Sequence, residues 1–460
     1  MKTKQKIYAI FLLSLLIGIT FYTGYTLAQS GNTFIISEGI YPQATYTIWE
    51  EGSTYYAKNI YGAIDYSGTN ATTVSNNAYS QLTNGGTVVF AQGTYIISGQ
   101  IEPTNNTVTY GYGAKFVKQA TSEYTVNLLN SYNVTIQGLE VDGQNIADRH
   151  LIVAFPAGNH LTFRDLWLYG ATTKPTGAGL WIGGALGGIS EGDVLIDNVR
   201  VEYTEGHCIS LKRISHVRVV NSFLSNQEPH TPLGTGYGGV TLENVTDAII
   251  ANNNLENNGE VGAYLASYTA NVCISNNVIR GNNYGIRLSG GNHYDTSITG
   301  NVIVDNLEQG IRVSGQFNGL SVTGNTIVYS GTDGIYLKNY GNGSSVISGN
   351  SITFNGDNGI YIDHAHYLTI SGNTILHNDR NDTGNSGIYL VNSKYSVIST
   401  SVISDIDENT QDWGIYYYSG DRNLILGISA IGNTIGGIFI NATVTNTEIH
   451  SCWNHTSWIT

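Results

Sequence analysis

Side chains able to perform acid–base chemistry concentrate in one stretch of this chain. The ionisable residues of that stretch are Glu202, Glu205, His207, Lys212, Glu228 and His230. Proton transfer needs a base and an acid held at one place, and histidine, lysine and carboxylates usually fill these two roles. The residues predicted to be catalytic are Glu205, His207, Lys212, Glu228 and His230.

These residues suit the removal of a proton from a carbon beside a substrate carboxylate. His207, Lys212 or Arg213 would act as the base, assisted by Glu205 and Glu228. The substrate carboxylate must also be neutralised, which a bound Ca²⁺ could do, although no cofactor is required. The alternative is that all of these side chains are solvated turn residues without a chemical role.

One pattern that often binds metals predicts no site here. Asp363, His364 and His366 form an HxH pair with a neighbouring carboxylate. No further cluster supports the pair, so we predict a solvated turn at the end of a strand and no metal site. The three cysteines are widely spaced and form no CxxC pair, which argues against a disulfide framework and a zinc site.

A second set of candidate residues forms a column suited to binding sugars. Alternate residues of a strand share a face, so the residue after each repeated Gly-Ile pair, or its equivalent, points outward. These residues are Trp181, Ser210, Thr241, Tyr264, Arg287, Arg312, Tyr336, Tyr361, Tyr389 and Tyr416. Aromatic faces offer flat surfaces to sugar rings, and arginine binds carboxylate or sulfate. The residues predicted to bind substrate are Trp181, Tyr264, Arg287, Arg312, Tyr336 and Tyr361. The alternative is that Tyr and Arg simply suit strand surfaces.

A repeat of about 24 residues must position both sets. Asn277, Asn301, Asn325, Asn350 and Asn373 follow one another at intervals of 24, 24, 25 and 23 residues. Each repeat contains three short stretches in which apolar and polar residues alternate, separated by Gly, Asn and Asp. One repeat cannot bury the apolar faces of three strands, whereas stacked coils bury a continuous core. The sequence therefore predicts an all-β solenoid with three strands per coil.

The repeated Asn and Gly are expected to be structural. Asn tolerates the left-handed backbone of a tight turn, and its amide can bond to the Asn of the next coil. The Gly before each Ile is expected to be a turn residue with positive φ. Two coils exceed the repeat length because of insertions near residues 172–193 and 227–238. Inserted loops on a regular scaffold commonly carry the functional site.

The beginning of the repeat region resembles a known superfamily. Residues 57–65 (AKNIYGAID) precede a predicted helix with Val74, Ala78 and Leu82 on one side, and residues 85–95 (GGTVVFAQGTY) follow it. This arrangement is similar to the N-terminal start of the pectate-lyase superfamily, although Ala91 stands where those proteins usually have Pro and fewer aspartates follow Gly62. The resemblance implies a right-handed parallel β-helix with an N-terminal capping helix. Members include polysaccharide lyases, polygalacturonase-like hydrolases, uronate epimerases, phage tailspikes and non-catalytic surface proteins.

Two local similarities bear on the reaction. Residues 205–211 look like the polygalacturonase segment with adjacent catalytic aspartates before a Cys-Ile pair, but Gly206 and His207 occupy those places. The polygalacturonase mechanism is therefore not transferred. The run Glu228-Pro229-His230 resembles the Asp-Pro-His motif of alginate epimerases, with one substitution.

Charge and the N-terminus indicate location and partners. Residues 1–28 have three lysines, an apolar run and small residues, which predicts a cleaved signal peptide, with an uncleaved N-terminal anchor as the alternative. The remaining chain has 17 basic and 34 acidic residues, a balance that disfavours nucleic acid and anionic membranes. Its abundance of Asn, Ser, Thr, Tyr and Gly predicts a secreted or cell-surface protein whose partner is an extracellular polysaccharide or cell-surface glycan. Sequons such as Asn133 would allow glycosylation.

The predicted organisation is a single extracellular solenoid. Its parts are a signal peptide (1–28), an N-terminal extension (29–56), a cap with the first coils (57–115), a right-handed parallel β-helix (116–450) and a C-terminal tail (451–460). Its predicted function is binding of an extended glycan that can contain uronates, and the resemblance implies processing of that glycan by a lyase, an epimerase or a glycoside hydrolase. The alternative is a non-catalytic structural or adhesive cell-surface protein.

Overall fold

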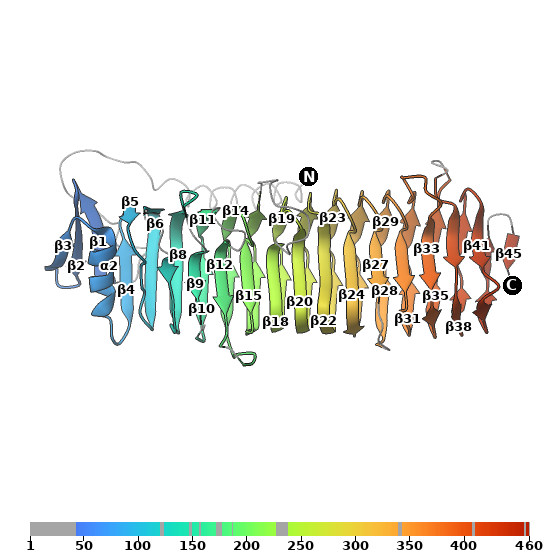
Figure 1. The fold of residues 1–460 in the computed structure, drawn as a ribbon, viewed down its shortest axis with the longest axis horizontal. Coiled ribbons are helices and arrows are strands. Elements are labelled where there is room, and N and C mark those ends of the chain that lie inside the picture. The colour runs from blue at the N-terminus through green and yellow to red at the C-terminus, as the bar shows by residue number, and fades with distance from the viewer. Residues whose placement is uncertain are drawn as a thin grey trace, which may run out of the picture. The chain divides into compact units, whose positions relative to one another are not determined.

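The computed structural model describes residues 43–119, 124–146, 150–155, 158–171, 177–185, 187–226, 238–338, 343–406, 410–454 and 457–459. The predicted signal peptide, Glu228 and His230 lie outside these ranges. Residues from Gln43 onward form one compact unit, an all-β parallel solenoid of about 13 turns with one helix. Strands of successive coils lie side by side along one axis (Figure 1).

The strands of each coil fall into three stacks, named here the first, second and third. The first stack contains β7 (Tyr124–Asn127), β9 (His150–Ala154), β12 (Ala178–Gly183), β15 (Ile209–Lys212), the beginnings of β18 (Gly238–Ala251), β20 (Val261–Ser275) and β22 (Tyr284–Thr299), β24 (Ile311–Asn318), β27 (Ile335–Lys338), β30 (Ile360–Asp363), β33 (Ser386–Val391), β37 (Trp413–Tyr417) and β41 (Gly436–Ile440).

The second stack continues from the first around each coil. It contains β4 (Gly86–Phe90), the beginnings of β6 (Thr107–Lys118) and β8 (Val134–Asp142), β10 (Leu161–Arg164), β13 (Val194–Asp197), β16 (Ser215–Val220), the ends of β18, β20 and β22, β25 (Leu320–Thr323), β28 (Ser345–Ser348), β31 (Leu368–Ser371), β35 (Val397–Ser399), β39 (Leu424–Leu426) and β43 (Glu448–His450).

The third stack closes each coil. It contains β5 (Gly93–Ile97), the ends of β6 and β8, β11 (Trp167–Ala171), β14 (Arg200–Thr204), β17 (Phe223–Ser225), β19 (Asn254–Glu256), β21 (Val278–Arg280), β23 (Val302–Val304), β26 (Thr326–Val328), β29 (Ser351–Thr353), β32 (Thr374–Leu376), β36 (Val402–Ser404), β40 (Ser429–Ile431) and β44 (Cys452–Asn454), with β45 (Ser457–Ile459) antiparallel to β44. A small separate sheet joins β34 (Ser393–Lys394), β38 (Gly420–Asp421) and β42 (Val444–Thr445).

The N-terminal end is built differently from the coils. Strands β1 (Tyr46–Glu51), β2 (Thr54–Asn59) and β3 (Ile64–Gly68) pair antiparallel, and β1 also pairs in parallel with β4. Helix α2 (Ala71–Ser80) begins at Asn70, whose side chain accepts a hydrogen bond from the Thr73 N–H at 3.0 Å. The helix buries Val74 and Ala78 in the core. Among the described residues, no helix is long and apolar enough to cross a membrane.

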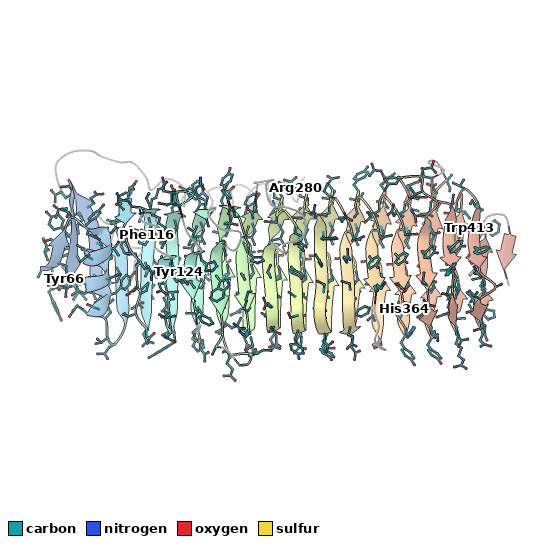
Figure 2. All side chains as sticks on the ribbon, viewed as in Figure 1. Tyr66, Phe116, Tyr124, Arg280, His364 and Trp413 are labelled. Atoms are coloured by element: carbon teal, nitrogen blue, oxygen red, sulfur yellow. The ribbon has the colours of Figure 1, made fainter. Side chains whose placement is uncertain are left out.

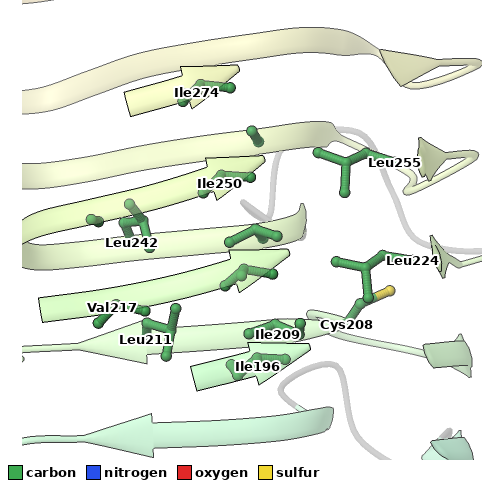
Figure 3. Close-up of a cluster of buried hydrophobic side chains, with 14 of the residues drawn as sticks. Ile196, Cys208, Ile209, Leu211, Val217, Leu224, Leu242, Ile250, Leu255 and Ile274 are labelled. Carbon is green, nitrogen blue, oxygen red and sulfur yellow. The ribbon is translucent and has the colours of Figure 1, made fainter. Parts of the chain in front are cut away.

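Coil length varies around the predicted repeat. The backbone partners Ile274 and Ile298 are 24 residues apart, whereas Leu161 and Val194 are 33 apart across the first insertion. The interior is a continuous apolar column in which side chains of neighbouring coils pack on one another, as Leu211 and Leu242 do in Figure 3. This core fixes which side chains of every strand face outward.

The predicted asparagine ladder is present, although its backbone differs from expectation. The Asn301 amide donates to Oδ1 of Asn325 at 3.0 Å, and the Asn301 backbone N–H donates to the same oxygen at 2.9 Å. The prediction that these asparagines adopt the left-handed conformation is wrong, because that conformation falls on the residue before them, such as Gly324 with φ +63°. The ladder residues are instead buried, and their amides satisfy backbone groups of two coils.

The prediction that the Gly before each Ile needs positive φ is also wrong. Gly285 does not have positive φ. A Cβ there would lie 2.4 Å from the Gly310 carbonyl oxygen and 2.6 Å from Cγ2 of Ile303. Only glycine therefore fits at this position between two coils, because any side chain would push the coils apart.

Replacing Gly285 with alanine is expected to destabilise the protein by more than about 2 kcal/mol, since two coils must separate locally. Gly324→Ala is the matched control: no atom lies within 4 Å of a Cβ at this position, so only backbone strain of about 1 kcal/mol remains. Thermal unfolding followed by circular dichroism measures both. Equal losses of stability in Gly285→Ala and Gly324→Ala would show that backbone conformation, and not the lack of room for a Cβ, makes glycine necessary at position 285.

Candidate functional site

The outward column predicted on the first stack is present. Backbone pairing places its members opposite one another in the order Trp181, Ser210, Thr241, Tyr264, Arg287, Arg312, Tyr336, Tyr361, Tyr389, Tyr416 and Phe439. This series is named here the outer column. A parallel column lies three residues before the outer-column position of each coil and includes Tyr124 and Trp413, which are labelled in Figure 2.

The tyrosines of the outer column stack on one another. The ring centroids of Tyr336 and Tyr361 are 5.1 Å apart with planes inclined by 3°, and those of Tyr361 and Tyr389 are 5.4 Å apart with planes inclined by 5°. Tyr416 and Phe439 continue the stack with a centroid distance of 4.7 Å. Neighbouring rings therefore cover the faces that the sequence suggested for sugar binding. The rings of Tyr336 and Tyr361 are only partly exposed.

The two arginines of the outer column lie between tyrosine rings. The Arg287 guanidinium carbon is 5.4 Å from the Tyr264 ring centroid and 5.1 Å from that of Tyr284. The corresponding distances of Arg312 are 5.3 Å to Tyr284 and 5.5 Å to Tyr336. Arg287 also forms an ion pair with the buried carboxylate of Glu260. Cation–π contacts on both sides hold each guanidinium plane rigidly.

The outer column is interrupted at two successive coils. Ser210 and Thr241 stand where the other coils carry a large side chain, and both are buried. On one side of them Trp181 stacks against His150, with centroids 5.4 Å apart and planes inclined by 9°. On the other side Tyr264 stacks against Arg287. Trp181 also contacts Phe155, with centroids 5.3 Å apart and planes inclined by 57°, so both of these ring neighbours come from the coil that precedes Trp181.

His207 lies in the turn that leads into this interruption. Its Nδ1 accepts a hydrogen bond from the Gly238 backbone N–H at 3.1 Å and lies 2.9 Å from Oγ1 of Thr241. Burial, together with the nearby positive charges of Lys212 and His150, lowers the pKa of His207 to about 3. The imidazole is therefore neutral near neutral pH. Since Nδ1 is the acceptor, the proton resides on Nε2, and His207 is placed as a hydrogen-bond donor.

The other predicted catalytic residues divide among three environments. Lys212, at the end of β15, forms an ion pair with Glu243 at 2.7 Å. Glu205 is partly buried in the turn of His207, and its backbone N–H donates to the Ala171 carbonyl at 3.0 Å. Glu202 belongs to the third stack, where Nε of Arg200 donates to it at 2.6 Å. The structure thus brings Glu205, His207 and Lys212 to one region and places Glu202 elsewhere.

Glu228 and His230 lie outside the described residues, but the ends of their segment are placed. The Asn226 amide donates to the Gly206 carbonyl at 3.0 Å, and the Gly238 N–H donates to His207. The described residues on either side of this segment, Asn226 and Gly238, therefore both contact the turn that carries His207. The second insertion begins and ends beside the interruption of the outer column.

His364, the first histidine of the HxH pair, is engaged in hydrogen bonds. Nδ1 of His364 pairs with the Asp363 carboxylate, and its Nε2 lies 3.2 Å from Nδ2 of Asn392. Lys338 also pairs with Asp363 at 2.9 Å. The described residues contain no group of three or more side chains arranged to hold a metal ion. Cys208 lies in the core beneath the His207 turn, where burial raises the pKa of its thiol to about 12 (Figure 3).

Sequence analysis overlooked a polar cluster on the third stack. Nζ of Lys115 lies 2.9 Å from Asp142 and 3.2 Å from Glu140. A few coils along, Arg200 lies between the rings of Trp167 and Phe223, with distances of 5.3 and 5.2 Å. Extending the outward-residue analysis from the first to the third strand of each coil would have found both groups. Within the first group Lys115 pairs with Glu140 and Asp142, and within the second Arg200 pairs with Glu202. These internal ion pairs indicate a stabilising role.

Stability is expected to fall between pH 6.5 and about 4. The buried His293 contributes, because burial lowers its pKa to about 4 while the unfolded chain protonates near 6.5. A folded-state pKa below the unfolded value leaves stability intact above pH 6.5 and reduces it as the pH falls. At pH 5 the cost is about 2 kcal/mol relative to pH 7. In urea unfolding, the free energy of unfolding lost between pH 7 and pH 5 should be about 2 kcal/mol smaller in His293→Gln than in the native protein. Identical losses in the two proteins would contradict the role of His293.

Comparison with known proteins identifies the fold. Two segments, residues 179–327 and 320–454, match the family described as "Right handed beta helix region" and together cover more than half of the chain. No curated protein matches the sequence.

Solved structures of phage proteins are similar to this chain. The Dettilon tailspike protein is 16% identical with a TM-score of 0.54, and the match covers 76% of this chain and 66% of the tailspike. The tailspike of Escherichia coli bacteriophage HK620, solved in complex with a hexasaccharide, is 12% identical with a TM-score of 0.53 over 83% of this chain and 74% of that chain. The N-terminal fragment of bacteriophage Phi29 gene product 12 is 16% identical with a TM-score of 0.54 over 82% and 68%. These identities show a shared fold alone, and the chain belongs to the right-handed β-helix family.

Proposed function

We propose that this protein is exported and binds an extended polysaccharide or cell-surface glycan along its first stack. The sugar lies at the interruption of the outer column, between Trp181 and Tyr264. Signal-peptide cleavage after residue 28, glycosylation and a capping role for α2 belong to the same proposal. The hexasaccharide bound by the HK620 tailspike supports a glycan as the class of ligand.

One observation carries the proposed binding site. Every tyrosine from Tyr336 to Tyr416 has a ring or guanidinium on both faces. In the described part of the chain, the rings that contact Trp181, those of His150 and Phe155, come from the preceding coil, and the cation that contacts Tyr264 comes from the following coil. Sugar rings bind to flat aromatic faces through their apolar C–H groups, so the faces of Trp181 and Tyr264 that adjoin Ser210 and Thr241 are the suitable ones. Coils stack about 4.8 Å apart, so the three coil steps from Trp181 to Tyr264 span about 14 Å.

We further propose that Glu205, His207, Lys212, Glu228 and His230 process the bound glycan as a lyase, epimerase or hydrolase would. The neutral His207 donates a hydrogen bond to a substrate oxygen on which charge develops. The paired Lys212 adds positive charge nearby. Proton abstraction then falls to Glu205, Glu228 or His230. A bound Ca²⁺ at the substrate carboxylate is compatible with this division of roles.

A panel of uronate-containing and neutral polysaccharides tests binding and turnover together. Processing would appear as new reducing ends, as ultraviolet absorbance of unsaturated uronates, or as epimerised residues by nuclear magnetic resonance. Glu205→Ala and His207→Gln should reduce turnover and leave the midpoint of thermal unfolding nearly unchanged. A panel with neither binding nor turnover would refute the proposed function.

The second candidate is a non-catalytic structural or adhesive surface protein. It is favoured by the stacked tyrosines and the asparagine ladder, both of which stiffen the solenoid without a chemical role. Glycan binding that persists unchanged when all five proposed catalytic residues are replaced by alanine, with no turnover before or after, would favour this candidate.

A further inference from the structure

Arg312 differs from the other cations on the strands of the first stack. Lys212, Arg287 and Lys338 each form an ion pair with a carboxylate, namely Glu243, Glu260 and Asp363. Among the described residues, no carboxylate lies within 4 Å of the Arg312 guanidinium. The difference is unexpected in a chain with 34 acidic and 20 basic residues. Arg312 therefore presents a positive charge that its surroundings leave uncompensated.

The surroundings of Arg312 hold this charge in a fixed position. The guanidinium lies between the rings of Tyr284 and Tyr336. Its Nη1 donates to the Tyr284 hydroxyl at 3.2 Å and lies 3.5 Å from Oε1 of Gln309. Nε is enclosed without a hydrogen-bond partner, which leaves the Nη2 amino group as the part of the fork able to bind an anion. Aromatic contacts explain how the cation remains stable without a carboxylate.

We propose that Arg312 binds an anionic substituent, a carboxylate or a sulfate, of the glycan on the first stack. This inference rests on the proposed function and adds the substrate class: an acidic glycan. Arg312 lies two coils from Tyr264. An anionic sugar bound at Arg312 would therefore be part of the same glycan whose other sugar units contact Trp181 and Tyr264. A preorganised guanidinium loses little conformational freedom on binding an oxyanion, and charge-assisted hydrogen bonds are strong.

The test compares three polymers and two arginine variants in the full chain. The polymers are polygalacturonate, its carboxyl-reduced neutral galactan and a sulfated galactan, measured by calorimetry at low ionic strength. The matched control is Arg218→Gln, which makes the same charge change on the second stack, where Arg218 pairs with Asp193 at 3.4 Å. Arg312→Lys keeps the charge but loses the planar fork.

The native chain should bind at least one of the two anionic polymers about tenfold more tightly than the neutral one. Arg312→Gln should lose this preference, Arg312→Lys should keep part of it, and Arg218→Gln should keep it all. An anionic preference that survives in Arg312→Gln, or its absence from a native chain that binds the neutral polymer, would overturn the role of Arg312 and leave glycan binding intact. Absence of binding to all three would overturn both proposals. Circular dichroism confirms that each variant is folded.

Discussion

Replacing Trp181 with alanine is expected to weaken glycan binding by about 30-fold. Burying an aromatic face against a ligand at the centre of an interface is worth about 2 kcal/mol, which corresponds to this factor. The indole already stacks on His150, so its orientation is fixed before the ligand arrives. Calorimetric titration of the best ligand from the polysaccharide panel measures the effect.

Trp167→Ala is the matched control for this prediction. Trp167 is 41% exposed and also packs against a cation, Arg200, but it belongs to the third stack. Its replacement should leave glycan affinity unchanged. Equal losses in the two variants, or a loss only with Trp167→Ala, would move the binding site away from the outer column.

Replacing Asn325 with alanine is expected to lower the free energy of unfolding by about 4 kcal/mol. The Asn325 amide accepts from the backbone and side chain of Asn301 and donates to the Ile298 carbonyl at 2.9 Å and to Asn350 at 3.0 Å. Removing it leaves several buried polar groups unsatisfied, at about 1–3 kcal/mol each. Urea unfolding followed by circular dichroism gives the change.

Asn77→Ala provides the comparison for the ladder. Asn77 is an exposed residue of α2, so its replacement should change stability by less than about 0.5 kcal/mol. A loss of less than about 1 kcal/mol in Asn325→Ala would show that the ladder contributes little to holding the coils together.

Much of the fold could be predicted because a solenoid repeats its constraints. The interval between ladder asparagines and the alternation around each Gly-Ile pair specify which residues share a column, and backbone pairing confirms the outer column from Trp181 to Tyr416. The structural roles of the repeated Asn and Gly residues were harder to predict from the sequence. Asn325 and Gly285 are selected by contacts with adjacent coils, which one repeat taken alone does not reveal.

The position of the candidate site stays a prediction, and the sequence showed little of its local geometry. The insertions and ionisable residues predicted a site around Glu205, His207 and Lys212, and the structure places these three residues in one region. Two features required three dimensions. The tyrosine rings cover one another, and the Gly238 N–H occupies Nδ1 of His207 and makes it a donor. A sequence lists residue types along a strand but not the direction of ring planes or the partner of each ring nitrogen.

A crystal structure with a bound oligosaccharide tests the central claim most directly. The ligand should be the member of the polysaccharide panel that binds most tightly. We predict a sugar ring against the face of Trp181 or Tyr264 that adjoins Ser210 and Thr241. The rest of the oligosaccharide should run along the first stack. An oligosaccharide bound to the third stack beside Trp167 and Arg200, with the outer column empty, would contradict the account.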